Sequence, residues 1–491
     1  MRRHLLLCAV VGCAPVIDAG PIPAVRAAAP VRTLTLPATD GEVVYLAAMV
    51  AAGSARDPVG HEGIAALTAR ALADAGAGDR DARAVRDALY TVGTELTVHA
   101  DRDWVSLRMS CPALAVTACV DLFADALVVP RFDSADVTRL RDDAVYAVTT
   151  GLLTDEEALA HAAFEGLLFE GHPYGNPVRG RGGALAALDP DDARAFHRTQ
   201  YVRESVLVGL AGAWTADAKL HLETRLQSLP TDRHPDVPVR TPPAVTGRSL
   251  LGIDTETPVT GFVLGHPIAV DRAHPDYAAM WVATTALGSH RQTFGRLFRA
   301  LRTDRGLNYG DYAYIEPHGA LPQHHPRFQM WIRPTSVENG PFALKLAVLE
   351  LERWASAGLD EEELEATRAW LSRTLPLAVR DPDRQLAQAL RAAASGVDLS
   401  VAAQRSALGA VTLSSVNAAL ATHIRPDDLL MVAVSGEADA LVAALTEDAA
   451  TPIVYSDVTP DAAAAERDEV VSQSDVQLQE AWTRPAQGVF R

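Results

Sequence analysis

Two groups of histidine and carboxylate residues have the chemistry of metal ligands. His61 directly precedes Glu62, and a second group lies in one polar stretch (EPHGALPQHHPR): Glu316, His318, His324 and His325. Imidazole and carboxylate groups both bind zinc, but only when the fold brings them onto one ion. Neither group has two histidines one helical turn apart. We therefore expect an exposed pair at 61–62 and a solvated loop at 316–325. A metalloenzyme built on the three loop histidines is the least favoured alternative.

Length and charge restrict the class of protein. The 491 residues include 44 Lys+Arg and 62 Asp+Glu, which gives a formal net charge of −18. A hydrophobic content of 48% with 22% charged residues is typical of a soluble globular chain and excludes a mostly disordered one. The acidic balance argues against nucleic acid, because phosphate binding needs a basic face. The length predicts two or more domains.

The N-terminus has the pattern of an export signal. A basic start at residues 1–3 precedes an apolar run at 4–13, which predicts a secretory signal. Val10-Val11-Gly12-Cys13 fits the bacterial lipobox, in which the cysteine is lipidated. We expect an exported protein, either in the periplasm or anchored as a lipoprotein through Cys13. One acyl chain would tether the protein without making it span the membrane. An ordinary signal cut further along, or no signal, are the alternatives.

Two cysteines remain after this segment. Cys111 and Cys119 are too few for a cysteine-based zinc site. They are expected to be small buried residues, and a disulfide between them stays possible in an exported protein.

The hydrophobic pattern divides the chain into two halves of similar order. Each half runs through early strands, helices, antiparallel strands, helices and a closing strand. This order predicts an α+β fold of two duplicated domains, each with an antiparallel-rich sheet packed with helices. A proline-rich polar stretch between the halves predicts a linker. The expected segments are a signal and linker at 1–30, an N-terminal domain at 31–230, the linker at 231–248, a C-terminal domain at 249–450 and a polar tail at 451–491.

Local signals place some elements. Apolar residues at helical spacing predict a helix at 63–75, and Thr154 with Glu157 has the spacing of a capping box for a helix that reaches about Leu168. Alternating apolar residues predict a hairpin with strands at 309–316 and 327–333.

Three stretches carry a family resemblance. They are GIAALTAR at 63–70, HPYGNPVRG at 172–180 and GRLFRALRTDRGLNY at 295–309. Their sequences, order and spacing resemble the pitrilysin/insulinase family of zinc metallopeptidases, and in particular its short two-domain bacterial branch. The resemblance covers about residues 32 to 450 and is most specific in the third stretch.

The resemblance also shows which catalytic groups the chain lacks. Family peptidases carry His-x-x-Glu-His on the helix that matches 63–70, where the histidines bind zinc and the Glu activates a zinc-bound water. On this pattern Ala66 and Arg70 occupy the histidine positions, and Ala69 occupies that of the Glu. A further zinc-binding Glu should fall at 144–148, where no carboxylate occurs. The resemblance therefore implies a degenerate zinc motif, no metal or cofactor in this chain, and no catalysis by it alone.

Arg305 and Tyr309 match another family feature. In the two-domain branch, the C-terminal domain supplies an Arg and a Tyr to the active cleft. An Arg fork can hold a substrate carbonyl or carboxylate, and a Tyr hydroxyl can donate to an oxyanion. The resemblance therefore implies peptide binding by this pair. The alternative is structural, with Arg305 at a helix end and Tyr309 packed at a strand start.

The expected function is that of the zinc-free subunit of a heterodimeric peptidase. The resemblance implies a homologous partner that carries His-x-x-Glu-His and the zinc, with this chain closing the cleft over a peptide substrate. The strand at 95–100, where family members hold substrate at a sheet edge, lacks the usual Asn. The alternative is a structural or binding protein without proteolysis, similar to the core subunits of respiratory cytochrome complexes.

Overall fold

The computed structural model describes residues 31–235, 241–316, 321–456, 458–460 and 462–489. The predicted signal segment, its Cys13 and His318 lie outside the described residues. Within the described part of the chain, no helix combines the length and the apolar composition that crossing a membrane requires.

The first sheet is formed by the first half of the chain. Its strands are β1 (Arg32–Thr35), β2 (Val43–Val50), β3 (Leu96–Ala100), β4 (Val105–Pro112) and β5 (Val206–Gly212). Their order is β1-β5-β2-β4-β3, with only β1 and β5 parallel. The closing strand β5 is buried along its whole length because it lies inside the sheet, whereas β3 forms an edge.

The second sheet repeats this order and extends it. Its strands are β6 (Arg248–Asp254), β7 (Val259–Pro267), β8 (Ser289–His290), β9 (Asp311–Tyr314), β10 (Arg327–Ser336), β11 (Leu429–Ser435) and β12 (Leu478–Pro485). Their order is β12-β6-β11-β7-β10-β9-β8. Strands β6, β11, β7, β10 and β9 follow the order of β1, β5, β2, β4 and β3. This confirms the predicted α+β fold of two similar halves.

Helices cover both sheets. In the first half they are α1 (Ile64–Asp74), α2 (Ala82–Thr91), α3 (Val116–Val128), α4 (Ser134–Thr149), α5 (Glu156–Leu168), α6 (Gly182–Ala187), α7 (Pro190–Gln200) and α8 (Ala216–Leu226). In the second half they are α9 (Tyr277–Leu287), α10 (Gly340–Ala357), α11 (Glu361–Ala378), α12 (Pro382–Ser395), α13 (Val401–Ala410), α14 (Leu413–His423), α15 (Ala438–Thr446) and α16 (Ala462–Gln473).

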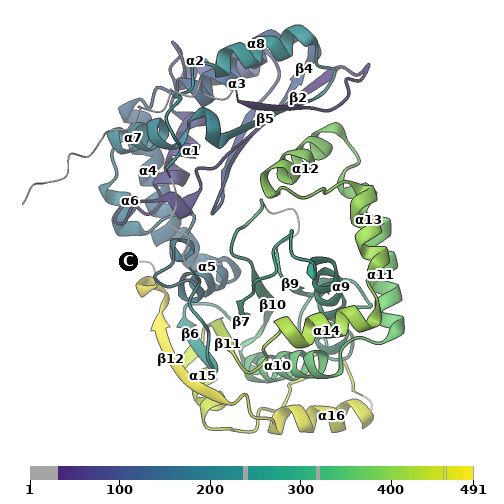
Figure 1. The fold of residues 1–491 in the computed structure, drawn as a ribbon. Helices are drawn as coiled ribbons and strands as arrows, with labels where there is room; N and C mark the ends of the chain where they lie inside the picture. Colours follow the sequence, from purple (N-terminus) through teal and green to yellow (C-terminus); the bar gives the residue numbers. More distant parts are fainter. Residues whose placement is uncertain (1–30, 236–240, 317–320, 457, 461, 490–491) are drawn as a thin grey trace, which may run out of the picture.

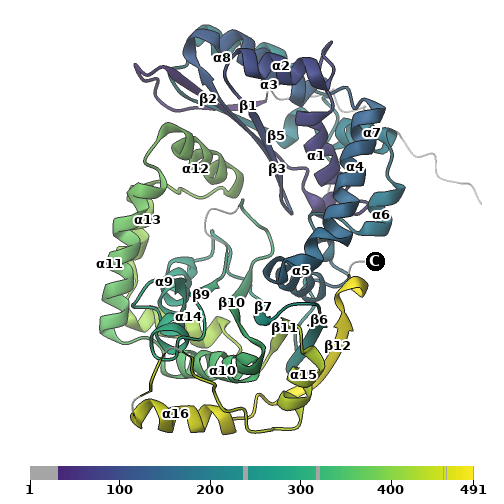
Figure 2. The ribbon, with the colours of Figure 1, turned by 180° about the vertical axis from the view of Figure 1, so that it is seen from behind.

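Each half contributes one helix that packs on the sheet of the other half (Figures 1 and 2). Helix α5 of the first half packs on β7 and β11 of the second sheet, and α12 of the second half packs on β5 and β2 of the first. The α12 contact buries Leu386 and Leu390 against apolar residues of the first sheet, Ala47, Met49, Leu207 and Ala211. The approach is close, because a Cβ added at Gly209 would lie 2.5 Å from Leu386 Cδ1. The interface between the two halves therefore contains buried apolar clusters as well as polar contacts.

We expect Leu386→Ala to destabilise the protein by about 2–4 kcal/mol, because it removes a fully buried side chain and leaves a cavity between the halves. Urea unfolding measures this loss. The exposed Leu377, just before α12, provides a matched control whose replacement by alanine should change the unfolding free energy by less than about 0.5 kcal/mol. Equal effects of the two substitutions would contradict the close packing of α12.

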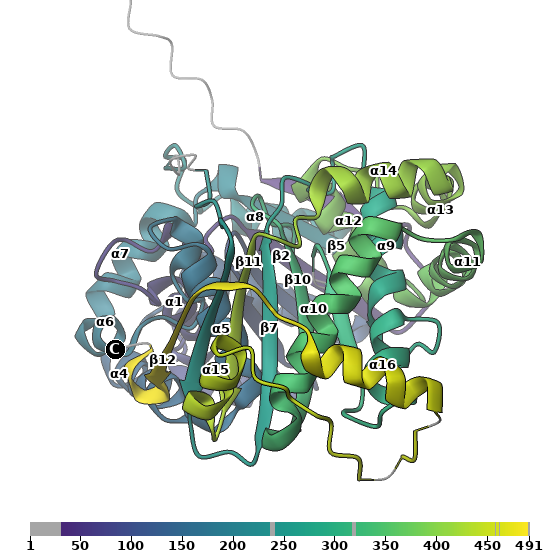
Figure 3. The same ribbon diagram turned by 90° about the horizontal axis from the view of Figure 1, so that it is seen from below.

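The segment after Thr451 corrects the sequence prediction of a polar tail. It forms α16 and β12, and β12 pairs in parallel with β6 at the edge of the second sheet (Figure 3). The pattern was missed because an edge strand and a surface helix bury few side chains. Val471 and Val476 nevertheless belong to the second core.

Cys111 at the end of β4 and Cys119 in α3 form a disulfide. Both residues are fully buried in the first core, where α3 packs on the sheet. The pairing that the sequence left open is thus made in the structure.

Candidate functional site

Helix α1 carries the three positions that correspond to the degenerate zinc motif. Ala69 is buried and Ala66 is partly buried, so methyl groups occupy two of the positions. Arg70 is half exposed, and its Nη2 lies 3.9 Å from Asp143 Oδ2 on α4. Two methyl groups and a guanidinium do not fit a zinc ion, which needs neutral or anionic ligands. The facing stretch 144–148 of α4 adds no carboxylate.

Asp57 holds the start of this helix. One of its carboxylate oxygens accepts from the Gly63 N–H at 2.7 Å and the other from the Ala65 N–H at 3.0 Å. Gly63 is the N-cap residue and has a φ of 107°, which favours glycine. Burial raises the pKa of Asp57 to about 8, against the opposing effect of these two donors. No motif in the sequence indicates this role of Asp57.

The raised pKa of Asp57 predicts a pH dependence of stability. Between about pH 4 and pH 8 the folded state keeps a proton that the unfolded chain releases, so the unfolding free energy falls as the pH rises. We expect Asp57→Asn to flatten this decline by on the order of 5 kcal/mol, as measured by urea unfolding at a series of pH values. Asp143→Asn, at a half-exposed carboxylate, is the control and should leave the decline unchanged. Parallel profiles for wild type and Asp57→Asn would contradict the prediction.

The edge strand β3 lies beside α1. It ends the first sheet, and the side chains of Thr97 and His99 are exposed while their neighbours are partly buried. An edge strand leaves backbone N–H and C=O groups without a partner strand, so an extended peptide can pair with it. The structure therefore leaves an unpaired strand edge next to the helix that carries Ala66, Ala69 and Arg70.

Arg305 lies in the core of the second half. Its side chain is 3% exposed, and its Nε and Nη2 contact Asp468 Oδ1 on α16 at 2.7 and 2.6 Å. Its Nη1 donates to the carbonyl oxygen of Ala300 at 2.7 Å. The guanidinium donates to these two groups rather than to a cleft. This placement differs from the expected substrate contact, because Asp468 of α16 and the Ala300 carbonyl oxygen occupy the guanidinium donors.

Tyr309 lies apart from Arg305. It is 64% exposed, and the guanidinium carbon of Arg302 lies 4.6 Å from the centre of its ring. Its hydroxyl is therefore accessible to a ligand or partner, and Arg302 is the cation beside it. The residues between them explain the separation, since the buried Asn308 donates to Asp311 at 2.7 Å and fixes the turn.

The histidine loop of the second half contacts the first half. The His324 N–H donates to the Tyr174 hydroxyl at 2.9 Å, and His324 Nδ1 lies 3.1 Å from Asp103 Oδ2. The His325 ring centre lies 4.5 Å from that of His172. His324 stays solvated as predicted, with a side chain that is 70% exposed, although it contacts Tyr174 and Asp103. His325 differs from the prediction, because it is partly buried against the HPYG turn. The hydrogen bond to Asp103 raises the pKa of His324, whereas burial lowers that of His325.

Glu316 and the pair at 61–62 have separate partners. Glu316 is buried and binds Arg272 Nε at 2.6 Å. His61 Nε2 lies 3.7 Å from Asp192, and Glu62 accepts from the Gly60 N–H at 3.1 Å. Among the described residues, none of the three belongs to a group of metal-ligating side chains.

A buried ion network joins the halves. Glu165 of α5 accepts from Arg102 of the first half through one oxygen and from Arg327 of β10 through the other. Burial is the largest influence on Glu165 and raises its pKa. The charges of the two arginines together outweigh burial and lower the pKa to about 2. Arg102 also donates to the Tyr174 carbonyl oxygen, so the network continues into the HPYG turn.

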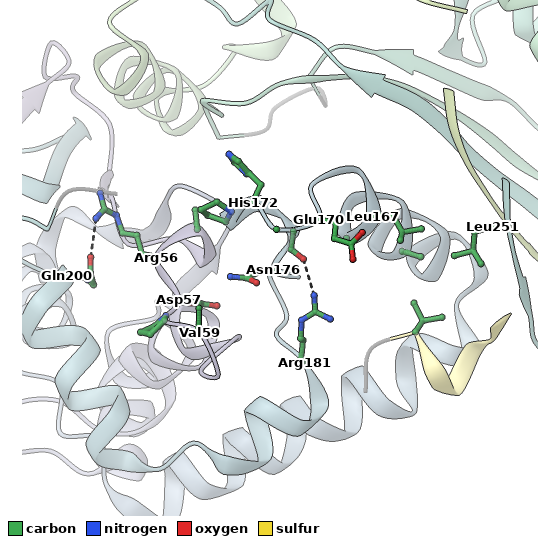
Figure 4. Close-up of a pocket in the computed structure, with 18 of the residues that line it drawn as sticks. Arg56, Asp57, Val59, Leu167, Glu170, His172, Asn176, Arg181, Gln200 and Leu251 are labelled. Carbon is green, nitrogen blue, oxygen red and sulfur yellow. Dashed lines mark hydrogen bonds between the residues drawn. The ribbon is translucent and has the colours of Figure 1, made fainter. Parts of the chain in front are cut away.

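A cavity of about 540 Å³ lies at the joint of the halves (Figure 4). The first half lines it with Asp57, Leu167 and Arg181, and the second half with Leu251 and Arg484. Because both halves line it, its shape depends on how they pack.

Comparison with known proteins gives two family matches. The profile described as "Insulinase (Peptidase family M16)" matches residues 32–180, and the one described as "Peptidase M16 inactive domain" matches residues 187–371. Together the two stretches make up more than half of the chain.

Curated relatives match about half of the chain. An uncharacterized zinc protease of Mycobacterium tuberculosis is 27% identical over 242 residues, 48% of this chain and 54% of the relative. A probable mitochondrial-processing peptidase subunit beta of Arabidopsis thaliana is 24% identical over 221 residues, 44% of this chain and 41% of the relative. The match thus spans about half the length of these relatives or less.

Solved structures share the fold. A chain described as peptidase M16 inactive domain, from Pseudomonas fluorescens, has a TM-score of 0.73 at 22% identity and covers 82% of this chain and 94% of its own. A protease from Helicobacter pylori has a TM-score of 0.73 at 13% identity, with coverages of 82% and 96%. A chain of complex III2 from Candida albicans has a TM-score of 0.66 at 15% identity, with coverages of 82% and 92%.

Proposed function

We propose, from the premise that the chain belongs to the insulinase (M16) family of peptidases, that it is a non-catalytic subunit of a zinc peptidase. The observation that carries the proposal is helix α1, where Ala66, Ala69 and Arg70 replace the zinc-binding and catalytic groups. Arg70, which lies 3.9 Å from Asp143, would put a cation where the family's zinc binds. The catalytic metal would be zinc held by a homologous partner with an intact His-x-x-Glu-His.

Two retained features support a role in peptide handling. The two-lobed fold is complete, and β3 still offers an edge beside α1. In the proposed complex Tyr309 donates its hydroxyl to the bound peptide, with Arg302 as the neighbouring cation, while Arg305 keeps its buried partner. This assignment replaces the expected Arg305/Tyr309 pair.

The proposal includes export. The basic and apolar N-terminus with Cys13 is a signal of the lipoprotein type, which would place the protein in the periplasm or on a membrane. The Cys111–Cys119 disulfide supports this location, since disulfides persist in oxidising compartments.

Reconstitution tests the proposed function. A fluorogenic peptide mixture is incubated with this chain alone, with a zinc-motif relative from the same genome alone, and with both, all in the presence of zinc. We expect activity only in the mixture, or activity well above that of the relative. Activity equal to that of the relative alone would overturn the proposal, as would zinc-dependent cleavage by this chain alone.

A substitution at Tyr309 tests its proposed contact with the peptide separately from the subunit role. We expect Tyr309→Phe to lower turnover of the mixture roughly tenfold without changing assembly, because it removes one hydroxyl donor. Tyr146→Phe, at another exposed tyrosine, is the control. Unchanged turnover by Tyr309→Phe in an intact complex would remove Tyr309 from the proposal and leave the subunit role standing.

A structural or binding role is the second candidate. It is favoured by helix α1, where the fold is kept while Ala66, Ala69 and Arg70 stand in place of the zinc-binding and catalytic groups. An assembly that forms with the relative but gives no gain in peptidase activity would favour this role.

A further inference from the structure

Three side chains with metal-binding chemistry converge outside the region of α1. His274 and Asp276 lie in the turn before α9, and His423 is the last residue of α14. One donor atom from each lies within 4.8 Å of the other two. The two elements are far apart in the chain, so no local sequence pattern indicates this cluster.

The distances fit a small ion. His423 Nε2 lies 2.8 Å from Asp276 Oδ2, and His274 Nδ1 lies 4.0 Å from the same oxygen. Ligands at zinc–ligand distances of about 2.0–2.2 Å in a tetrahedral site lie roughly 3.3 Å from each other. The two observed separations bracket this value, so shifts of less than about 1 Å would place all three donors on one ion.

The surroundings suit a site that keeps water ligands. The side chains of His274, Asp276 and His423 are 29%, 42% and 13% exposed, so they are partly covered and still open to solvent. His274 Nδ1 accepts from the Asp276 N–H at 3.1 Å, which holds the ring beside the carboxylate. A metal on Nδ1 would replace this hydrogen bond with a coordinate bond.

We propose that His274, Asp276 and His423 form a binding site for a divalent transition-metal ion, zinc by preference. Two imidazoles and one carboxylate are a donor set that zinc, cobalt and nickel accept, with water completing the shell. The ion joins the turn before α9 to the end of α14. The site departs from the expectation that this chain carries no metal.

Zinc binding by the full chain tests the proposal. The chelator-treated protein is titrated with zinc chloride by calorimetry, and Co²⁺ is added separately to record its visible absorption. We expect one zinc ion per chain with a micromolar Kd and a rise in Tm of a few degrees at saturating zinc. His423→Gln keeps a hydrogen-bond donor for Asp276 and should lower the affinity at least roughly tenfold, as should His274→Ala.

Two controls locate the ion. His221 makes a comparable pair with Asp121 at 2.9 Å, so His221→Ala should leave binding unchanged. His325→Ala tests the histidine loop in the same way. Wild-type binding by His423→Gln and His274→Ala, loss of binding only in His325→Ala, or no zinc bound by wild type would each overturn the proposal. No peptide or partner enters these measurements, so their outcome is independent of the proposed peptidase role.

Discussion

Replacing Glu165 by alanine is expected to destabilise the protein by about 3–5 kcal/mol. Arg102 and Arg327 are 3% and 4% exposed, and both donate to Glu165, which is 20% exposed. Without the carboxylate, two buried guanidiniums remain beside neutral acceptors and repel each other. Leaving a buried charge unpaired is far more costly than losing an exposed ion pair. Urea unfolding of the full chain measures the loss.

The matched control lies on the same helix. Glu157 also pairs with an arginine of the second half, Arg333, at 2.9 Å, but both side chains are more exposed. We expect Glu157→Ala to change the unfolding free energy by less than about 1 kcal/mol. Similar losses for the two variants would show that the Glu165 network stabilises the protein no more than the exposed Glu157–Arg333 pair does.

The Glu165 network also has a pH signature. Its folded-state pKa of about 2 lies below the unfolded value, so its contribution is present above about pH 4.5 and is lost as the pH falls toward 2. The contribution of Asp57 to stability depends on pH in the opposite direction, because its raised pKa favours the folded state at acidic pH. The contribution of Glu165 is therefore lost at acidic pH and that of Asp57 toward neutral pH.

Arg305→Ala is expected to destabilise the second half by about 3–5 kcal/mol, because it leaves Asp468 buried without its guanidinium. Tyr455 also donates its hydroxyl to Asp468, and this single neutral donor cannot replace a cation. Unfolding of Arg305→Ala and of Arg305→Ala with Asp468→Ala measures the effect. The double variant should lose less than the sum of the single losses, since it removes both charges.

The outcome for Arg305 bears on how activity data are interpreted. If Arg305→Ala lowers turnover of a complex, unfolding of this chain is the first explanation to test. Tyr309→Phe removes only an exposed hydroxyl and should leave the unfolding free energy within about 0.5 kcal/mol of wild type. An unchanged unfolding free energy for Arg305→Ala would contradict the buried ion pair and restore a role in binding.

The sequence alone was sufficient for several local elements, although not for α16 and β12. Helical spacing predicted a helix at 63–75, and α1 spans Ile64–Asp74. The helix predicted to start near Thr154 exists as α5, but its N-cap is Asp155, which accepts from the Ala158 N–H. Thr154 instead donates to the Gly151 carbonyl oxygen. Capping residues one position apart compete for the same helix end, and the path of the preceding chain decides between them.

The sequence by itself determined the repeated α+β halves, the family resemblance and the missing zinc ligands. Placed by the family resemblance, Ala66, Ala69 and Arg70 carry none of the groups that bind zinc or activate a zinc-bound water. Only the tertiary structure decided on which sheet each helix packs, because the apolar face of a helix does not specify the surface that covers it. It placed α5 and α12 on the opposite sheets, joined Arg305 to Asp468, and brought His423 to His274 and Asp276. Each of these contacts joins residues that are far apart in the chain. A local sequence pattern does not indicate which distant residues will meet.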